Sequence, residues 1–317
     1  MDRAELLRLL SEHERVSGER LAQRLGVTRA AISKQIDALR REGCEISALP
    51  RLGYRLLSVP SPLTEQGVRE RLGDHPWAER VSVLAAVDST NTYLKRAAAR
   101  GALHGTAVIA DCQTQGRGRR GRSFDSAAGT GLYLSVLLRP RCASRELMTL
   151  TAQTAVAVRR TLRRVCGVDA GIKWVNDLFL GGKKICGILT ELTVEAESGA
   201  VDCAVIGVGI NCTRTEFPEP LRDIAGSVLS QTGVVPDRSA LAAELIRALW
   251  QLPAAGDGAD WLSEYRAACI TLGRQVTVQT PDGERTGVAE DVGPEAELIV
   301  RLPTGERIEV NSGEAVF

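Results

Sequence analysis

The stretch QTQGRGRRGRSF, from Gln113 to Phe124, contains four arginines, three glycines and no acidic residue. Glycine disfavours regular helix and strand, so this stretch predicts a loop. It follows the apolar run Gly105–Ala110 and precedes the apolar run Gly131–Leu138. A cationic, glycine-rich connection between two buried strands is suited to closing over a phosphate, because its backbone N–H groups and its guanidinium groups can both approach an anion. The alternative is a solvated basic loop that holds no ligand.

The residues around this arginine–glycine loop predict one mixed α/β unit over about 65–268. The runs TAVIADCQ and LYLSVLLRP predict strands on either side of the loop, and ELMTLTAQTAVAVRRTLRRV predicts a long helix. The runs GIKWVNDLFL, KKICGILTEL and CAVIGVGIN predict three further strands. A unit of this size is large enough for a catalytic domain.

Polar residues interrupt the apolar pattern of KWVNDLFLGGKKICGIL, from Lys173 to Leu189. Asn176 and Asp177 stand where one predicted strand ends, and Lys184 opens the next strand after a Gly-Gly turn. A lysine at the start of a hairpin strand is either an ordinary surface charge or a cation directed at a ligand.

Two other stretches are candidates for ligand contact. In VDSTNTYLK, from Val87 to Lys95, the side chains of Ser89, Thr90 and Asn91 can cap a helix or hydrogen-bond a neutral polar ligand. In GVGIN, Gly207–Asn211, glycines at a strand end permit close approach of a ligand.

Residues 1–60 predict a winged helix-turn-helix. Ser17 is placed to cap a short helix, Gly26 to end it in a left-handed turn, and Thr28 to cap a second, basic helix. Residues 44–58 alternate around a proline and a glycine, which predicts a two-stranded wing. A three-helix packing module with a solvated basic face is the alternative, but the complete pattern favours DNA binding. The candidate DNA-binding residues are Thr28, Arg29, Ser33, Lys34 and Arg51.

The linker and the C-terminal region complete the predicted organisation. Residues 58–64 contain two prolines and small polar residues, as linkers do. Residues 269–317 alternate between short apolar runs and glycine turns, which predicts a small SH3-like β-barrel. The fold class is therefore α+β multidomain, with boundaries at 1–60, 65–268 and 269–317.

Composition limits the functions that are open to the chain. Its 317 residues carry a net charge of +1, so any nucleic-acid contact must come from a local patch. There are eight cysteines without a C-x-x-C pair and three scattered histidines, so we expect no fixed metal site and buried, reduced thiols. The N-terminus lacks the apolar core of a signal peptide, and no apolar run has the roughly 18–20 residues of a membrane span. We therefore expect a cytoplasmic protein with no membrane partner.

Taken in order, DSTN, GRGRRGR, KWVND with GKKICGIL, and GVGIN resemble the biotin–protein ligases. The N-terminal helix-turn-helix is similar to that of the bifunctional subgroup that also represses biotin synthesis genes, and the tail resembles the family's C-terminal domain. The resemblance implies a class II synthetase-like ligase domain that uses ATP and Mg²⁺ to convert biotin into biotinyl-5′-AMP. The biotinyl group is then transferred to a lysine of a biotin carboxyl carrier protein.

The same resemblance assigns roles to residues. The implied catalytic residues are Lys184 and Arg119. The implied biotin-binding residues are Ser89, Thr90, Asn91, Gln113, Arg117, Gly118, Arg119 and Lys184. The implied nucleotide-binding residues are Arg122, Phe124, Asn176, Asp177 and Asn211, with Mg²⁺ entering with ATP near Asp177.

The resemblance also implies regulation and leaves rival functions open. We expect the loop to be mobile when empty and ordered over the adenylate, and the adenylate-bound chain to form a homodimer on a two-fold operator DNA. The alternatives are a ligand-sensing repressor without ligase activity, a lipoate-type ligase, and a ligase that no longer represses. The sequence departs from the usual family pattern at Val175, where proline is common, and at Asp111–Cys112.

Overall fold

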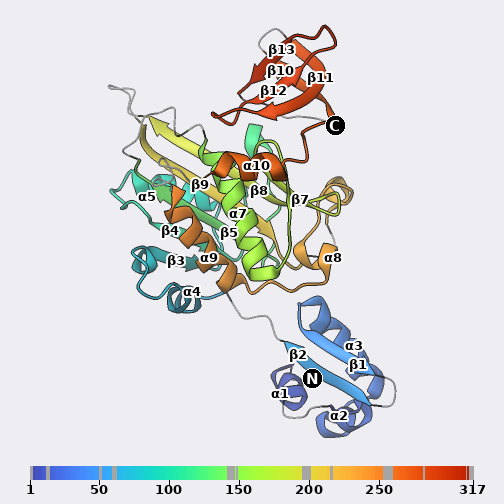
Figure 1. The fold of residues 1–317 in the computed structure, drawn as a ribbon. Coiled ribbons are helices and arrows are strands. Elements are labelled where there is room, and N and C mark those ends of the chain that lie inside the picture. The colour runs from blue at the N-terminus through green and yellow to red at the C-terminus, as the bar shows by residue number, and fades with distance from the viewer. Residues whose placement is uncertain are drawn as a thin grey trace.

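The computed structural model contains three units along the chain (Figure 1). The residues that it describes are 3–11, 15–49, 52–58, 63–140, 147, 149–194, 201–214, 217–252, 260–280, 283–311 and 313.

The N-terminal unit is a three-helix module with a hairpin. Its elements are α1 (Arg3–Ser11), α2 (Gly18–Leu25), α3 (Arg29–Arg41), β1 (Glu45–Leu49) and β2 (Gly53–Ser58). β1 and β2 pair antiparallel, which confirms the predicted wing.

The capping residues predicted from the sequence set the helix boundaries of this unit. The Ser17 hydroxyl accepts from Arg20 N at the start of α2, and the Thr28 hydroxyl accepts from Ala31 N at the start of α3. Gly26 ends α2 with φ 63°, a left-handed conformation that glycine adopts without a steric penalty. The helices bury one apolar cluster, whose fully buried members include Leu6, Leu21, Ile32, Ile36 and Leu39.

The central unit is built on a seven-stranded mixed sheet in the order β3-β4-β5-β9-β8-β7-β6. Only β3 and β4 pair in parallel, and the other neighbours are antiparallel. The strands are β3 (Val81–Leu84), β4 (Ala107–Ala110), β5 (Gly131–Leu138), β6 (Gly171–Lys173), β7 (Asp177–Leu180), β8 (Lys183–Val194) and β9 (Val201–Asn211).

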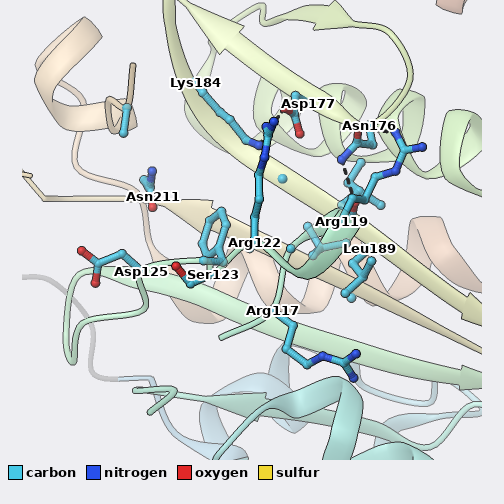
Figure 2. A pocket seen from close by; sticks show the side chains of 18 of the residues that line it. Arg117, Arg119, Arg122, Ser123, Asp125, Asn176, Asp177, Lys184, Leu189 and Asn211 are labelled. Carbon is cyan, nitrogen blue, oxygen red and sulfur yellow. Dashed lines mark hydrogen bonds and ion pairs between the residues drawn. The ribbon is translucent and has the colours of Figure 1, made fainter. Parts of the chain in front are cut away.

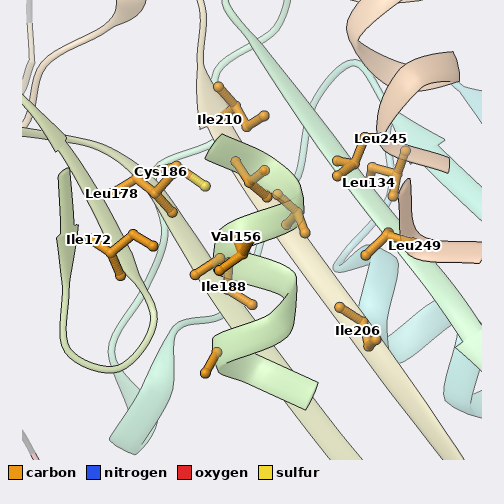
Figure 3. Close-up of a cluster of buried hydrophobic side chains, with 14 of the residues drawn as sticks. Leu134, Val156, Ile172, Leu178, Cys186, Ile188, Ile206, Ile210, Leu245 and Leu249 are labelled. Atoms are coloured by element: carbon orange, nitrogen blue, oxygen red, sulfur yellow. The ribbon is translucent and has the colours of Figure 1, made fainter. Parts of the chain in front are cut away.

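Helices cover both faces of this sheet, because its central strands are apolar on both sides. Two long helices, α7 (Leu150–Cys166) and α9 (Arg238–Trp250), pack on one face, where Val156 of α7 lies among strand residues such as Ile188 (Figure 3). On the other face, α5 (Thr90–Ala98) packs through a smaller cluster. The structure also describes α4 (Glu65–Leu72), α8 (Val228–Thr232) and α10 (Trp261–Ala268).

One predicted strand is wrong. GIKWVNDLFL was expected to form a single strand, but Trp174–Asn176 is a turn that joins β6 to β7 in a hairpin. Tertiary contacts fix this turn: Trp174 N donates to Thr271 Oγ1, and the Trp174 indole N–H donates to Ala296 O. Both partners lie about a hundred residues further along the chain, beyond the range of local patterns.

The C-terminal unit is an antiparallel sheet in the order β10-β11-β12-β13, which confirms the predicted small β unit. Its strands are β10 (Gln275–Thr280), β11 (Gly283–Val292), β12 (Leu298–Arg301) and β13 (Arg307–Val310). Buried side chains of this sheet, such as Val276, belong to the same apolar cluster as the central sheet. The two units therefore share a core.

The cysteines are reduced where the structure describes them, and most are buried. Cys112 and Cys166 are only partly buried, so the expectation that all thiols lie in the core is wrong for these two. Cys142 lies outside the described residues. None of the helices that the structure describes is both long and apolar enough to cross a membrane.

Candidate active site

A cavity of about 620 Å³ opens between the arginine–glycine loop and the strands β8 and β9 (Figure 2). Every residue that the sequence analysis assigned to biotin, nucleotide or catalysis lines it. These are Ser89, Thr90, Asn91, Gln113, Arg117, Gly118, Arg119, Arg122, Phe124, Asn176, Asp177, Lys184 and Asn211. They come from segments up to 122 positions apart (211 − 89), so the fold alone brings them together.

One end of the cavity is lined by the uncharged polar side chains of Ser89, Thr90, Asn91 and Gln113. Ser89 caps α5, so its hydroxyl accepts from Thr92 N at 3.5 Å, as expected for a helix cap. The side-chain oxygen of Gln113 accepts from Thr90 N at 2.9 Å and from the Thr90 hydroxyl at 3.1 Å. The Gln113 amide nitrogen donates to the Ser126 hydroxyl at 2.8 Å. This network fixes the Gln113 amide at the cavity wall.

Hydrogen bonds to both the nitrogen and the oxygen of its side-chain amide hold Asn91 at the same end of the cavity. Its nitrogen donates to Leu189 O at 3.2 Å and to Glu191 Oε2 at 2.9 Å, and its oxygen accepts from the Ser135 hydroxyl at 2.6 Å. Asn91 is 3% exposed. Its two N–H donors are both used within the protein, so Asn91 shapes the wall more than it offers a donor to a ligand.

Glu191 and Ser135 support the cavity wall through their hydrogen bonds to Asn91, and the sequence analysis missed both. Each stands inside a strand as an ordinary strand residue, and no local motif marks it. Burial raises the pKa of Glu191, but hydrogen bonds and charges from Lys95, Asn91 and Arg117 outweigh that effect and leave the pKa below its usual value. Glu191 is therefore an anion within hydrogen-bond reach of the neutral end of the cavity.

The opposite end of the cavity is strongly charged. Lys184 Nζ lies 2.7 Å from Asp177 Oδ2. Arg119 donates to Asn176 Oδ1 at 3.0 Å, and the Asn176 amide nitrogen donates to Ile188 O at 3.0 Å. These contacts orient Lys184 and Arg119 toward the same region, where an anionic group of a ligand would be neutralised.

The arginine–glycine loop folds back on itself as a tight hairpin. Gly118 N donates to Arg122 O at 2.7 Å, and Phe124 N donates to Gly116 O at 2.8 Å. Arg120 at its tip has φ 55°, a left-handed conformation that a non-glycine residue adopts at a cost of about 1–2 kcal/mol. The loop thus forms a defined hairpin, and the expectation that it is mobile when empty and ordered over the adenylate stays a prediction.

Glycines in β8 and β9 make room for side chains of the protein itself. A β-carbon on Gly207 would lie 2.2 Å from Asn91 Oδ1, and one on Gly209 would lie 2.6 Å from the Phe124 ring. A β-carbon on Gly187 would lie 3.3 Å from the same ring. The expectation that these glycines admit a ligand is therefore incomplete, because Asn91 and Phe124 occupy part of that space.

A third wall is apolar and was not predicted. Phe217, Leu221, Ile224 and Ala225 line the cavity beside Asn211, whose amide nitrogen donates to Gly226 O at 2.9 Å. Ile224 is 54% exposed, so this wall offers apolar surface to a flat ligand group. The run EFPEPLRDIAG has no periodicity, so the sequence carried no signal for it.

The cysteines near the cavity are not nucleophiles. Burial raises the pKa of the Cys212 thiol to about 12 and also raises that of the Cys186 thiol. Thiols held this far from ionisation are inert. Among the described residues, no group of three or more His, Cys, Asp or Glu side chains is placed to hold a metal ion.

Asp177 nevertheless fits a Mg²⁺ ion that enters with a nucleotide. One of its carboxylate oxygens, Oδ1, is buried, and no described residue hydrogen-bonds to it. Mg²⁺ is commonly bound through one or two carboxylates and the substrate phosphates, and a single free carboxylate oxygen satisfies that requirement.

The predicted DNA-binding residues gather on α3 of the N-terminal unit. Arg29, Ser33 and Lys34 are exposed on this helix, and Thr28 is its N-cap. Arg51 lies outside the described residues. Arg40 of the same helix donates to Ile46 O at 2.7 Å and so ties α3 to the wing.

The fold and the cavity together define a ligase class with an appended DNA-binding unit. Residues 83–211 match the Biotin/lipoate A/B protein ligase family, residues 3–55 match an HTH domain, and residues 271–317 match the Biotin protein ligase C terminal domain.

Comparison with individual proteins shows which ligases within this class the chain is similar to. The chain is 34% identical over 298 residues to the bifunctional ligase/repressor BirA of Escherichia coli K12, covering 93% of this chain and 91% of the relative. It is 37% identical over 241 residues to the protein of the same name from Bacillus subtilis strain 168, covering 75% and 74%. Its structure is similar to that of the Aquifex aeolicus biotin protein ligase in complex with biotin and ATP, with a TM-score of 0.65, 28% identity, and coverage of 74% and 97%. The chain therefore belongs to the biotin protein ligase family, which confirms the resemblance seen in the sequence.

Proposed function

We propose that this protein activates biotin with ATP and transfers the biotinyl group to a lysine of a biotin carboxyl carrier protein. A biotin carboxylate oxygen attacks the α-phosphorus of ATP, the bond to pyrophosphate breaks, and biotinyl-5′-AMP forms. The carrier amine then attacks the acyl carbon, loses a proton, and displaces AMP. One observation carries this proposal: a single cavity joins a neutral polar end to a cationic end.

The neutral end suits the ureido ring of biotin. Thr90 and Gln113 offer neutral donors and acceptors there, and an uncharged ring would not have to compete with a fixed charge for them. Asn91 supports this wall through its contacts with Ser135 and Leu189.

The cationic end suits the carboxylate and the phosphate. In the proposed role, the Lys184 ammonium exchanges Asp177 for the ligand oxygens and stabilises the negative charge that develops at phosphorus. Arg119, oriented by Asn176, adds a second fixed cation. Mg²⁺, held by Asp177 and the phosphates, would add charge neutralisation.

The nucleotide base is proposed to lie between Phe124 and the apolar wall around Ile224, close to Asn211. Arg122 extends to the side of the cavity where Lys184 and Asp177 lie (Figure 2). That direction suits contact with phosphate oxygens.

The N-terminal unit supports a second role as a repressor of biotin synthesis genes. We infer that the adenylate-bound chain forms a homodimer on two-fold operator DNA in the cytoplasm, with biotinyl-5′-AMP as corepressor. Exposed Arg29 and Lys34 on α3 are placed to contact phosphates and base edges. The match of this unit to an HTH domain supports the inference.

The test is transfer of radiolabelled biotin to a carrier domain in the presence of ATP and Mg²⁺. Wild-type protein and Lys183→Ala should label the carrier, and Lys184→Ala should label it at least about a hundredfold more slowly, the usual cost of losing one preorganised charge-stabilising group. Lys183 is a matched control because its ammonium leaves the cavity and donates to Asp223 O. Biotin binding without labelling by wild type would favour a sensing repressor without ligase activity, and labelling with lipoate would favour a lipoate-type ligase.

A further inference from the structure

The Glu191 carboxylate of β8 pairs with two cations and accepts a hydrogen bond from an amide. Its Oε1 lies 2.7 Å from Lys95 Nζ of α5 and 3.1 Å from Arg117 NH1 of the arginine–glycine loop. Its Oε2 accepts from the Asn91 amide at 2.9 Å. The Glu191 side chain is only 18% exposed, so its interactions are less screened than those of a surface pair. One carboxylate therefore joins the loop to the biotin end of the cavity.

Arg117 is the loop arginine that makes this contact. In Figure 2, Arg119 and Arg122 extend toward the side of the cavity with Asp177 and Lys184, whereas Arg117 extends toward the opposite side. A guanidinium directed away from the cationic end is poorly placed to contact a phosphate there. Its pairing with Glu191 instead fastens the first half of the loop to the sheet.

We propose that Glu191 is a positioning residue that latches the arginine–glycine loop over the biotin end of the cavity through Arg117, with Lys95 competing for the same carboxylate oxygen. This inference rests on the proposed function, because it assigns the loop to biotin. The loop can open without leaving a buried charge unpaired. When the loop lifts and Arg117 leaves, Lys95 stays paired with Glu191.

The shared oxygen gives the two partners of Glu191 opposite effects on the loop. Glu191→Gln removes the charge that attracts Arg117, so the loop opens more often. Lys95→Met removes the competing cation, so that Glu191 Oε1 keeps its ion pair with Arg117 and loses the one with Lys95. The loop should then open less often. A residue that only stabilised the fold would give the same sign in both variants.

The test is amide hydrogen exchange of residues 113–124 in the full-length, ligand-free protein. The reporters are Thr114 and Gln115, whose N–H groups donate to Val87 O and Asp88 O outside the loop and are therefore exposed when the loop lifts. Exchange should be about two- to fivefold faster in Glu191→Gln and slower by a similar factor in Lys95→Met, the range expected for a partly exposed ion pair. Glu290→Gln is the matched control, because Glu290 also pairs with two arginines but lies in the C-terminal unit.

A second readout concerns biotin itself. In Glu191→Gln the KM for biotin should rise by about two- to fivefold while kcat stays within about twofold, because the loop closes less tightly on the same chemical groups. Unchanged loop exchange in Glu191→Gln, or faster exchange in Lys95→Met, would overturn the latch. If Glu191→Gln does not fold, Lys95→Met decides alone, with slower exchange as the supporting result. The exchange arm needs no catalysis, so its failure is distinct from a failure of the ligase assignment.

Discussion

Replacing Gly207 by alanine tests the packing behind Asn91 at the uncharged polar end of the cavity. The new β-carbon would lie 2.2 Å from Asn91 Oδ1 and 2.9 Å from Asn91 Cγ, far inside van der Waals contact. Asn91 cannot turn aside freely, because Ser135, Leu189 and Glu191 hold its amide. Relief of the clash must therefore strain the strand or break these hydrogen bonds.

The expected loss of stability follows from these contacts. Overpacking a tight site costs about 1–3 kcal/mol. Breaking two neutral hydrogen bonds and one to a carboxylate costs about 0.5–1.5 kcal/mol for each neutral bond and about 1.5–3 kcal/mol for the charged one. Since the chain will take the less costly of the two routes, we expect Gly207→Ala to lower the free energy of unfolding by about 1–3 kcal/mol.

The assay is urea unfolding followed by tryptophan fluorescence, because Trp77 and Trp174 are both buried in the central unit. The informative control is Gly207→Ala in an Asn91→Ala background. The three nearest atoms to the new methyl group all belong to the Asn91 amide, so in that background the substitution should be neutral or slightly stabilising. A loss of about 1–3 kcal/mol in both backgrounds would refute the reasoning, because it would show that Asn91 is not what the methyl group meets.

Three further outcomes are expected. Asp111→Ala should lower the free energy of unfolding by about 1–2 kcal/mol. The Asp111 carboxylate pairs with Arg238 at 2.5 Å, and its removal leaves a guanidinium that is only 13% exposed without its counter-charge. An unchanged urea midpoint would contradict this. Burial and the charge of Arg247 lower the pKa of His75, so the stability that it contributes is complete above about pH 6.5 and falls as the pH drops below that value. If the urea midpoint fell as steeply from pH 7.5 to about 5.5 in His75→Phe as in wild type, His75 would not be the source of this pH dependence. Lys34→Ala should weaken binding to any duplex DNA and reduce the slope of log affinity against log salt by about 1, as measured by fluorescence anisotropy; an unaltered slope would exclude a phosphate contact.

Local rules predicted the parts of the fold that local interactions determine. Ser17, Gly26 and Thr28 set helix boundaries through contacts within three or four residues, so their roles were visible in the sequence. The turn at Trp174–Asn176 was not, because it depends on partners near residues 271 and 296.

The candidate site divides in the same way. The arginine–glycine loop and Lys184 stood out because glycine and charge are unusual beside apolar strands. Glu191 did not, because a charged residue in a strand is ordinary until the fold brings residues 95 and 117 against it. Asp111, a departure from the usual family pattern, proves to be a structural residue that anchors Arg238 and accepts from Gly129 N at 3.1 Å.

The short connection between the first two units limits where DNA can lie. β2 ends at Ser58 and α4 begins at Glu65, capped by Thr64 and fixed to the core through Val68 and Leu72. The six Cα–Cα steps from Ser58 to Thr64 span at most about 22 Å even when fully extended. The position of α3 is therefore restricted to a short distance from the ligase unit. In a pair of chains, the contact between the two ligase units would set the distance between the two operator half-sites.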